Sequence, residues 1–183
     1  MTNFESIKMA PKMNLFLTGF LIFTSIGCTF PSVSLPESQE KVVNPSFSNF
    51  TAKVIRIVDG DTLEVLYGEL PVMIRLQHID CPEKKGSQPY GKKAKETLSE
   101  LCFGKNVQVK YSGDKDRNCR YICEIFTEDG LNINQEMVKR GMAWHYKKYS
   151  TDPTYSQLEK DARSQKVGLW ADPNPVPPWE WRK

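Results

Sequence analysis

Short runs of alternating apolar and polar residues, each ended by a turn, are the feature that most limits how this chain can fold. Alternation with a period of two in β-branched segments predicts strands with one buried face. Five such runs occur: Val54–Val58, Thr62–Tyr67, Val72–Ile79, Asn106–Tyr111 and Tyr121–Phe126. The Asp59-Gly60-Asp61 turn between the first two predicts a hairpin. The chain is therefore predicted to be built on five short strands.

Three helical segments accompany these strands. Lys92–Cys102 has apolar residues at helical spacing, Asn134–Arg140 is a short helix stopped by Gly141, and Asp152–Gln165 opens with an N-cap followed by proline. Three strands, a helix, two strands and further helices is the order of a five-stranded Greek-key barrel of the OB type. We predict an α+β, mainly β fold of this kind with about three flanking helices. A plain α+β sandwich is the alternative.

Residues 1–27 have the pattern of an export signal. Two lysines precede an apolar run, Asn14–Gly27, that is too short for a comfortable membrane span. The small residue before Cys28 resembles a bacterial lipobox, in which the cysteine is acylated, although Ser25 stands where leucine is usual. We expect a lipoprotein signal peptide and lipidation of Cys28. The alternatives are an uncleaved or differently cleaved export signal, with a secreted protein as the alternative localisation, and a buried N-terminal helix.

The segments on either side of the predicted domain differ from it in composition. Residues 28–48 are rich in serine and proline and poor in large apolar side chains, so we expect a disordered tether. Residues 49–171 form the domain. Residues 172–183 are a Pro/Trp-rich tail that cannot continue a helix. Trp179 and Trp181 are expected to lie across the domain surface, with ligand stacking as the alternative.

Composition excludes some classes of protein without selecting a function. The chain has only two histidines and no close cysteine pair with partner ligands at zinc-finger spacing, which argues against a structural zinc site. A net charge of +3 is too small to establish a nucleic-acid partner. The function must be sought in the places where polar side chains gather.

Polar side chains gather in three short segments that a strand-rich core does not require. These are Asp59–Thr62, Arg75–Glu83 and Asp116–Arg120. Taken singly, the first two have ordinary explanations, namely a turn for the first and a strand-edge salt bridge or a loop for the second. The occurrence of all three in strand order favours a functional site.

The carboxylates in the first two segments suit a hard divalent cation. Asp61 and Asp80 can supply oxygen ligands to Ca²⁺, and the main-chain carbonyl of Cys81 can join them because a proline keeps the chain extended there. Glu83 lies beyond that bend, where it can reach a water molecule. Arg75 adds a guanidinium group that matches phosphate oxygens. Carboxylates, a metal and arginines are what phosphodiester cleavage requires.

These motifs resemble the staphylococcal nuclease (thermonuclease) family. The resemblance runs from about Phe50 to Asp172 and rests on five segments: Val58–Thr62, Ile74–Glu83, Gln88–Gly91, Val138–Trp144 and Gly168–Pro173. It implies a Ca²⁺-dependent endonuclease that acts on DNA and RNA and leaves 3′-phosphate ends.

The resemblance also implies a role for each matching residue. Three catalytic residues are expected, one to activate or orient water and two to bind the phosphate: Glu83, Arg75 and Arg120. Three calcium ligands are expected: Asp61, Asp80 and the main-chain carbonyl of Cys81. Four substrate-binding residues are expected: Thr62, Lys115, Tyr146 and Tyr149.

Two features around this site need separate interpretation. Asn118-Cys119 stands where the family usually has Tyr-Gly, which removes a tyrosine and tightens the turn, and Arg117 is the substitute if Arg120 is displaced. Tyr146 and Tyr149 resemble an aromatic segment that packs against bases. The alternative is that they are surface aromatics on a link between helices.

Four cysteines lie within the domain, and an exported chain meets oxidising conditions. Cys102 and Cys123 sit at positions predicted to face the core, whereas Cys81 and Cys119 sit at the predicted rim of the site. We therefore expect the disulfides Cys102–Cys123 and Cys81–Cys119, with four free thiols as the alternative.

The sequence therefore predicts a monomeric, Ca²⁺-dependent endonuclease that faces the periplasm or cell exterior, anchored in a membrane through Cys28. The main alternative is a non-catalytic OB-type module that binds nucleic acid or protein. Retention of every catalytic and calcium-binding side chain favours the enzyme, because a degenerate domain would be expected to lose some. A structural or adhesive surface lipoprotein is a third possibility that would need only the tether and the tail.

Overall fold

The computed structural model describes residues 49–183, so the predicted signal peptide, the tether and Cys28 lie outside the described residues. Five strands close into a barrel in the order β1-β2-β3-β6-β5, with β1 pairing back to β5. They are β1 (Phe50–Asp59), β2 (Thr62–Tyr67), β3 (Leu70–Leu76), β5 (Asn106–Lys115) and β6 (Tyr121–Thr127). Neighbouring strands are antiparallel except β3 and β6, which are parallel. The predicted OB-type barrel is confirmed.

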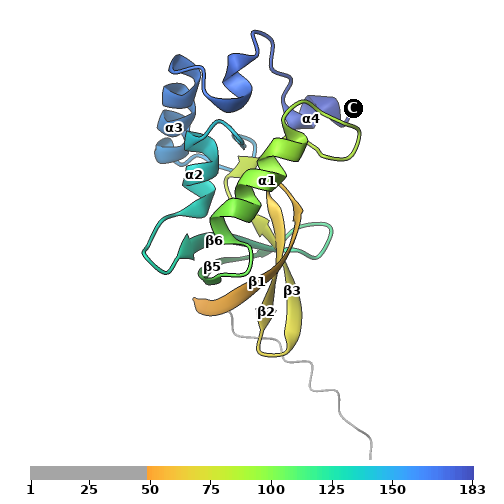
Figure 1. The fold of residues 1–183 in the computed structure, drawn as a ribbon, viewed down its shortest axis with the longest axis vertical. Coiled ribbons are helices and arrows are strands. Elements are labelled where there is room, and N and C mark those ends of the chain that lie inside the picture. Colours follow the sequence, from red (N-terminus) through yellow and green to blue (C-terminus); the bar gives the residue numbers. More distant parts are fainter. Residues whose placement is uncertain (1–48) are drawn as a thin grey trace, which may run out of the picture. The chain divides into compact units, whose positions relative to one another are not determined.

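The helices lie outside the barrel, where α1 packs against β1 and α2 packs against α3 (Figure 1). They are α1 (Gly91–Cys102), α2 (Ile133–Lys139), α3 (Pro153–Ser164), the 3₁₀ turn η1 (Gly168–Ala171) and the short α4 (Pro178–Trp181). A separate two-stranded sheet pairs β4 (Ile79–Asp80) with β7 (Trp144–His145). Within residues 49–183 no helix has the length and apolar character needed to span a membrane.

The interior of the barrel follows from the alternation in the sequence. In β5, Val107 and Val109 are fully buried while Gln108 between them is exposed. In β2, Leu63 and Val65 are buried in the same way. Each fully buried aliphatic side chain contributes about 1.5–3 kcal/mol. This alternating burial fixes the register of the strands, and hence the positions of the polar residues at their ends.

The run Val72–Ile79, predicted as one strand, is two. β3 ends at Leu76 and β4 begins at Ile79, because His78 between them has a left-handed backbone with φ of 69°. The carbonyl of His78 accepts a hydrogen bond from the Tyr146 amide at 2.8 Å. This break turns the chain out of the barrel and into the pair with β7.

Two glycines fix the path of the chain toward its C-terminus. Gly141 and Gly168 both have positive φ, and the amide of Leu169 donates to the carbonyl of Gly141 at 2.8 Å. A Cβ on Gly141 would lie 2.2 Å from the carbonyl oxygen of Val167, which is far inside contact distance. The backbones therefore cross at a separation that only glycine permits.

The C-terminal tail, which was predicted to be unable to continue a helix, forms a short helix of its own in its last residues. Pro178 occupies the first turn of α4, where proline's missing amide hydrogen costs nothing. The expected surface position of Trp179 is confirmed, since its ring packs edge-on against Trp144 with centroids 5.6 Å apart. The tail therefore folds back on the domain.

The predicted disulfides are also wrong, because Cys81, Cys102, Cys119 and Cys123 are all free thiols. Cys102 donates its thiol hydrogen to the carbonyl of Leu98 at 3.2 Å within α1. Cys81 is buried, whereas Cys119 is exposed at the tip of a loop. Sharing a core or a rim, as the sequence suggested, does not bring two sulfur atoms within bonding distance.

Candidate active site

The turn between β1 and β2 is packed tightly against the rest of the site. The Gly60 amide donates to the side chain of Asp59 at 2.9 Å. A Cβ on Gly60 would lie 2.8 Å from the Cβ atoms of both Ala94 and Cys81. Glycine at this position therefore allows α1 and the loop after β4 to approach, and Asp61 is held against that loop.

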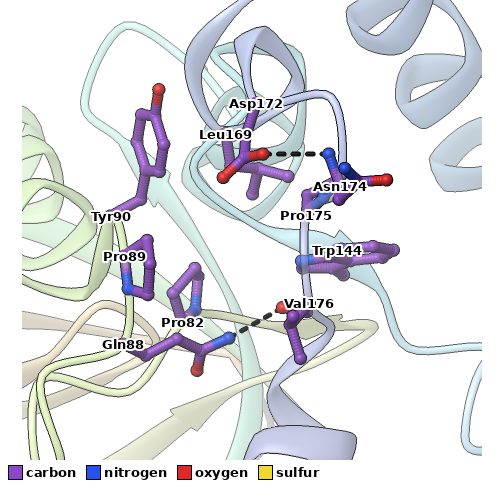
Figure 2. A pocket seen from close by; sticks show the side chains of 10 residues that line it. All are labelled: Pro82, Gln88, Pro89, Tyr90, Trp144, Leu169, Asp172, Asn174, Pro175 and Val176. Atoms are coloured by element: carbon purple, nitrogen blue, oxygen red, sulfur yellow. Dashed lines mark hydrogen bonds between the residues drawn. The ribbon is translucent and has the colours of Figure 1, made fainter.

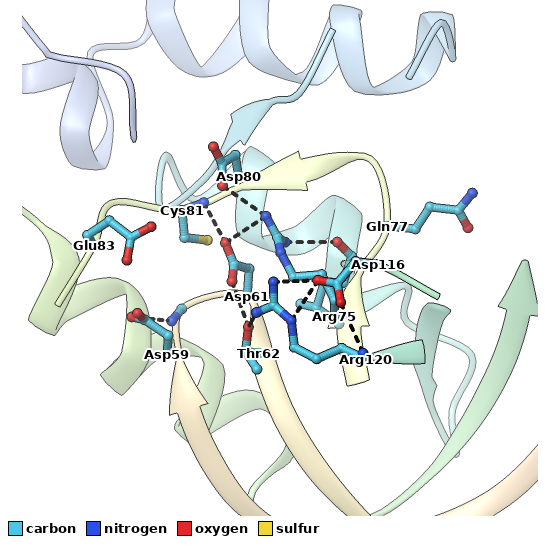
Figure 3. A network of polar contacts seen from close by, with 12 residues as sticks. Asp59, Asp61, Thr62, Arg75, Gln77, Asp80, Cys81, Glu83, Asp116 and Arg120 are labelled. Carbon is cyan, nitrogen blue, oxygen red and sulfur yellow. Dashed lines mark hydrogen bonds and ion pairs between the residues drawn. The ribbon is translucent and has the colours of Figure 1, made fainter. Parts of the chain in front are cut away.

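Asp61 is buried and connects three parts of the site. Its Oδ2 accepts a hydrogen bond from the Cys81 amide at 2.9 Å, and its Oδ1 accepts one from the Thr62 hydroxyl at 3.0 Å. Its main-chain carbonyl accepts the Leu76 amide at 2.8 Å. These bonds orient the carboxylate toward Asp80 and Arg75, as Figure 3 shows.

Arg75 lies between the two aspartates. Its Nη2 is 2.8 Å from Oδ1 of Asp80 and 3.2 Å from Oδ2 of Asp61. Burial acts to lower the pKa of Arg75, but the charges of Asp61 and Asp80 outweigh it and raise that pKa. The guanidinium is thus fixed as a cation at the base of the site.

Asp80 is the most buried charged group of the site, with a side chain that is 0% exposed. Burial raises its pKa, and the charge of Asp61 acts in the same direction, while Arg182 and Arg75 oppose them. Asp61 and Asp80 both contact Nη2 of Arg75, and two carboxylates this close together repel one another unless cations lie between them. The site is therefore built to accept positive charge.

Arg120 is in place despite the Asn118-Cys119 departure. Its Nη1 donates to the Thr62 hydroxyl at 2.7 Å, and its Nε donates to Oδ2 of Asp116 at 2.8 Å. Cys119 adopts φ of 60°, the left-handed conformation that glycine takes easily. Asp116 also accepts the amides of Asn118 and Arg120 at 2.9 and 3.0 Å, so it shapes the loop. Arg117 is not needed as a substitute.

Asp116 and Arg182 were missed by reasoning from the sequence. Asp116 was part of a polar segment, and its spacing of four from Arg120 was the available signal. Arg182 binds Oδ2 of Asp80 at 2.6 Å and also contacts Glu83, residues 102 and 99 positions away. Burial acts to lower the pKa of Arg182, but its hydrogen bonds to Asp80 and Glu83 raise it well above the usual value. No local pattern could have revealed this contact.

The aromatic segment after β7 is anchored through a serine. Ser150 Oγ lies 2.9 Å from Nδ1 of His78 and 2.9 Å from Nε2 of His145. Tyr146 and Tyr149 stand edge-to-face with centroids 5.0 Å apart, and Tyr149 is 69% exposed. The pair presents aromatic surface to solvent on a fixed loop.

Lys115 is not brought into the carboxylate and arginine network. Its ammonium lies 4.1 Å from the centre of the Tyr121 ring, at the end of β5. This cation–π contact holds the side chain on the barrel wall. The structure thus groups Asp61, Thr62, Arg75, Asp80, Glu83 and Arg120 and leaves Lys115 outside that group.

The hard oxygen donors of this group fit a calcium ion, though not on side chains alone. Among residues 49–183 no cluster of three or more His, Cys, Asp or Glu side chains could hold a metal. Ca²⁺ also accepts main-chain carbonyls and water, so Asp61, Asp80 and the Cys81 carbonyl form a suitable set. Burial, reinforced by the charge of Asp61, raises the pKa of the Cys81 thiol well above its usual value. Cys81 is therefore a neutral thiol, and neither a thiolate ligand nor a nucleophile.

One pocket lies under the tail, beside the loop that carries Glu83, and Pro82 and Gln88 are among its lining residues (Figure 2). It has a volume of about 140 Å³ and is lined in part by Gln88, Tyr90, Trp144 and Val176. Small-molecule sites are commonly about 300–1,000 Å³, so this space is a packing gap beneath the tail. The carboxylate and arginine group is therefore the candidate for chemistry.

Comparison with known proteins agrees with this geometry. Residues 73–172 match the family model described as "Staphylococcal nuclease homologue", which is more than half of the chain. An "Uncharacterized endonuclease" of Escherichia coli is 47% identical over 130 residues, covering 71% of this chain and 83% of the relative. The chain belongs to the staphylococcal nuclease family. It is thus a nuclease, a hydrolase that cleaves phosphodiester bonds.

Two further relatives of this nuclease have names of the same kind. An "Uncharacterized endonuclease" of Haemophilus influenzae is 48% identical over 134 residues, which is 73% of each chain. A "Micrococcal nuclease" of Shigella flexneri is 38% identical over 149 residues, covering 76% of this chain and 84% of the relative. The family match contains Arg75, Asp80, Glu83 and Arg120, and it ends at residue 172, before most of the tail.

Proposed function

We propose that this nuclease is a Ca²⁺-dependent endonuclease that hydrolyses DNA and RNA outside the cytoplasm and leaves 3′-phosphate ends. The observation that carries the proposal is the convergence of two guanidinium groups on adjacent residues. Arg75 binds Asp61 at 3.2 Å, and Arg120 binds Thr62 at 2.7 Å. Two cations held together beside carboxylates are suited to a phosphate whose charge grows during the reaction.

Arg75 and Arg120 bind and neutralise the scissile phosphate. Each guanidinium is already fixed by a carboxylate, Arg75 by Asp80 and Arg120 by Asp116, so little reorganisation accompanies the reaction. A guanidinium can offer two parallel N–H groups to phosphate oxygens. The arginines therefore stabilise the transition state more than the ground state.

Glu83 orients the attacking water and accepts its proton. The water oxygen forms a bond to phosphorus while the bond from phosphorus to the 5′-oxygen breaks, and the 5′-oxygen leaves as a hydroxyl after taking up a proton. The 3′-oxygen keeps the phosphate. The loop that carries Glu83 is fixed, because the Glu83 amide donates to Oε1 of Gln88 at 2.8 Å.

Asp61, Asp80 and the carbonyl of Cys81 would hold Ca²⁺. When bound there, the ion supplies Lewis-acid polarisation of a phosphoryl oxygen. The short-range repulsion between the two aspartates favours binding of a divalent cation. Their burial excludes water that would otherwise weaken these electrostatic interactions.

Tyr146 and Tyr149 bind the substrate by stacking on its bases. Aromatic rings stack on every base, so this mode of binding is tolerant of sequence and of the sugar. It therefore supports action on both DNA and RNA. Export, lipidation of Cys28 and a monomeric state complete the proposal and rest on the sequence.

Cleavage assays with the purified full chain test the proposed function. We expect single-stranded DNA and RNA to be cleaved with Ca²⁺ and left intact with chelator, and the products to carry 3′-phosphates that a phosphatase removes. Glu83→Gln should abolish most cleavage while the DNA affinity, measured by fluorescence anisotropy, stays within about twofold. Chelator-insensitive cleavage would contradict the calcium requirement. Binding without any cleavage would leave the non-catalytic module as the correct interpretation.

A further inference from the structure

The C-terminal tail places a guanidinium on the carboxylates of the active site. Nη2 of Arg182 lies 2.6 Å from Oδ2 of Asp80, and Nη1 lies 3.3 Å from Oδ1 of the same side chain. Nη1 also contacts Oε1 of Glu83. Arg182 thus bridges the two carboxylates in the forked geometry typical of strong arginine–carboxylate pairs.

Two further contacts hold the tail in this position. The ring of Trp179 lies parallel to that of Tyr146, with an interplanar angle of 7° and centroids 5.4 Å apart. Gln88 donates from Nε2 to the carbonyl of Val176 at 2.8 Å (Figure 2). Its Oε1 accepts the Glu83 amide at 2.8 Å. The same glutamine therefore ties the tail to the loop that carries Glu83.

Arg182 and Trp179 both contact side chains to which the proposed function assigns a role in the reaction. Ca²⁺ binds carboxylate oxygens at about 2.3–2.6 Å, and the guanidinium 2.6 Å from Oδ2 of Asp80 places a positive charge beside the same oxygen, which repels the ion. A Glu83 that is paired with Arg182 is also not free to accept a proton from water. On the aromatic side, Trp179 covers the face of Tyr146 on which a base would stack.

We propose that the C-terminal tail competes with Ca²⁺ and with substrate for the active site of its own molecule. Arg182 occupies the position of the calcium ion beside Asp80, and Trp179 covers the face of Tyr146 on which a base would stack. This inference rests on the proposed function, because it requires Asp80 to bind Ca²⁺. The Arg182 side chain is 38% exposed, so solvent weakens its ion pairs. The binding free energy of a calcium ion can therefore offset the loss of these ion pairs when the tail is released. Calcium and substrate thereby shift the population toward molecules in which the tail is released from the active site.

Calcium titration by calorimetry without nucleic acid tests the competition. We compare the full chain with Arg182→Gln, and with Lys183→Gln as a control that removes the same charge one residue away. Arg182→Gln should bind Ca²⁺ about tenfold more tightly than Lys183→Gln, which is about 1.4 kcal/mol. Arg182→Lys should fall between the wild type and Arg182→Gln because it loses the fork but keeps the charge. Equal or weaker binding by Arg182→Gln than by Lys183→Gln overturns the proposal.

Tryptophan fluorescence gives an independent measurement of tail release. Ca²⁺ should shift the emission of the wild type to longer wavelength as Trp179 leaves its ring contacts, and Trp179→Phe should show a much smaller shift. Equal shifts in the two chains would reject release of Trp179. If neither the wild type nor Arg182→Gln binds Ca²⁺, the proposed function and this inference both fail. If both bind Ca²⁺ equally and cleave DNA, only the inference about Arg182 fails.

Discussion

At the residue scale, the position of Arg120 depends on a carboxylate in its own loop. Asp116 binds the Arg120 guanidinium at 2.6 Å through Nη2 and also accepts two amides of the loop. Burial acts to raise the pKa of Asp116, but the hydrogen bonds from Arg120 outweigh it and hold that pKa below the usual value. The carboxylate is therefore ionised at neutral pH and acts as a positioning group.

Asp116→Asn should lower the cleavage rate about ten- to a hundredfold, because hydrogen bonds to charged groups contribute about 1.5–3 kcal/mol. Steady-state kinetics on single-stranded DNA measures the effect. The control is Asp114→Asn, which removes the same charge from an exposed residue two positions earlier. Equal rates for the two variants would show that Asp116 does not position Arg120.

The buried thiol of Cys102 makes the free energy of unfolding fall at alkaline pH. Burial raises the pKa of Cys102 from 9.0 to about 12. Between these values the unfolded chain loses the thiol proton and the folded chain keeps it, so stability falls as pH rises from 9 toward 12. At pH 10.5 this group alone costs about 2 kcal/mol relative to pH 8.

Urea unfolding at pH 8 and pH 10.5 tests this prediction. Cys102→Ala should lose about 2 kcal/mol less than the wild type between the two pH values. Cys119→Ala, which removes an exposed thiol, controls for the loss of a cysteine. If Cys102→Ala has the same pH dependence as the wild type, the thiol does not titrate as the structure implies.

Most of the residues that form the carboxylate and arginine group could be identified from the sequence because they follow strand ends in short motifs. Asp61 and Asp80 are examples, since each belongs to such a motif, and the Cys81 amide links the two motifs by donating to Oδ2 of Asp61. Arg182 could not be identified, because its contact with Asp80 depends on how the whole C-terminal segment folds back. The disulfide prediction failed for a related reason: membership of a common core does not specify the distance between two sulfur atoms.

At the element scale, five strands could be predicted because alternation reports burial on one face. The break within Val72–Ile79 could not, because the alternating pattern continues through it. It is imposed by His78, whose carbonyl bonds to the Tyr146 amide of a distant loop. Similarly, the prolines of the C-terminal tail exclude a long helix but permit a single helical turn that begins with Pro178.

The crossing of Gly141 and Gly168 determines where the C-terminal segment starts. Gly141→Ala should destabilise the protein by at least about 2 kcal/mol, because a Cβ would meet the Val167 carbonyl and φ is positive. Gly104→Ala is a matched control, since Gly104 also has positive φ but nothing lies within 4 Å of the added Cβ. Thermal unfolding of both variants measures the difference. A loss of stability no larger than that of Gly104→Ala would mean that the crossing can relax.

At the scale of the whole molecule, the nuclease machinery and the predicted membrane anchor lie in separate parts of the sequence. Every residue to which the proposed function assigns catalysis, calcium binding or base stacking falls between Asp61 and Tyr149, within the described residues 49–183. The expected lipidation site, Cys28, precedes these residues in the sequence. Localisation and catalysis should therefore respond independently to substitution.

Cys28→Ser should move the protein out of the membrane fraction while specific activity on DNA stays within about twofold of the wild type. The reason is that lipidation needs the thiol of Cys28, and a second acyl chain or more is what makes membrane attachment stable. Fractionation of expressing cells, followed by a cleavage assay of each fraction, measures both properties. Cys119→Ser provides the control, since it removes a cysteine from the domain and should leave the protein in the membrane fraction. Membrane attachment that survives Cys28→Ser would instead indicate an uncleaved N-terminal segment as the anchor.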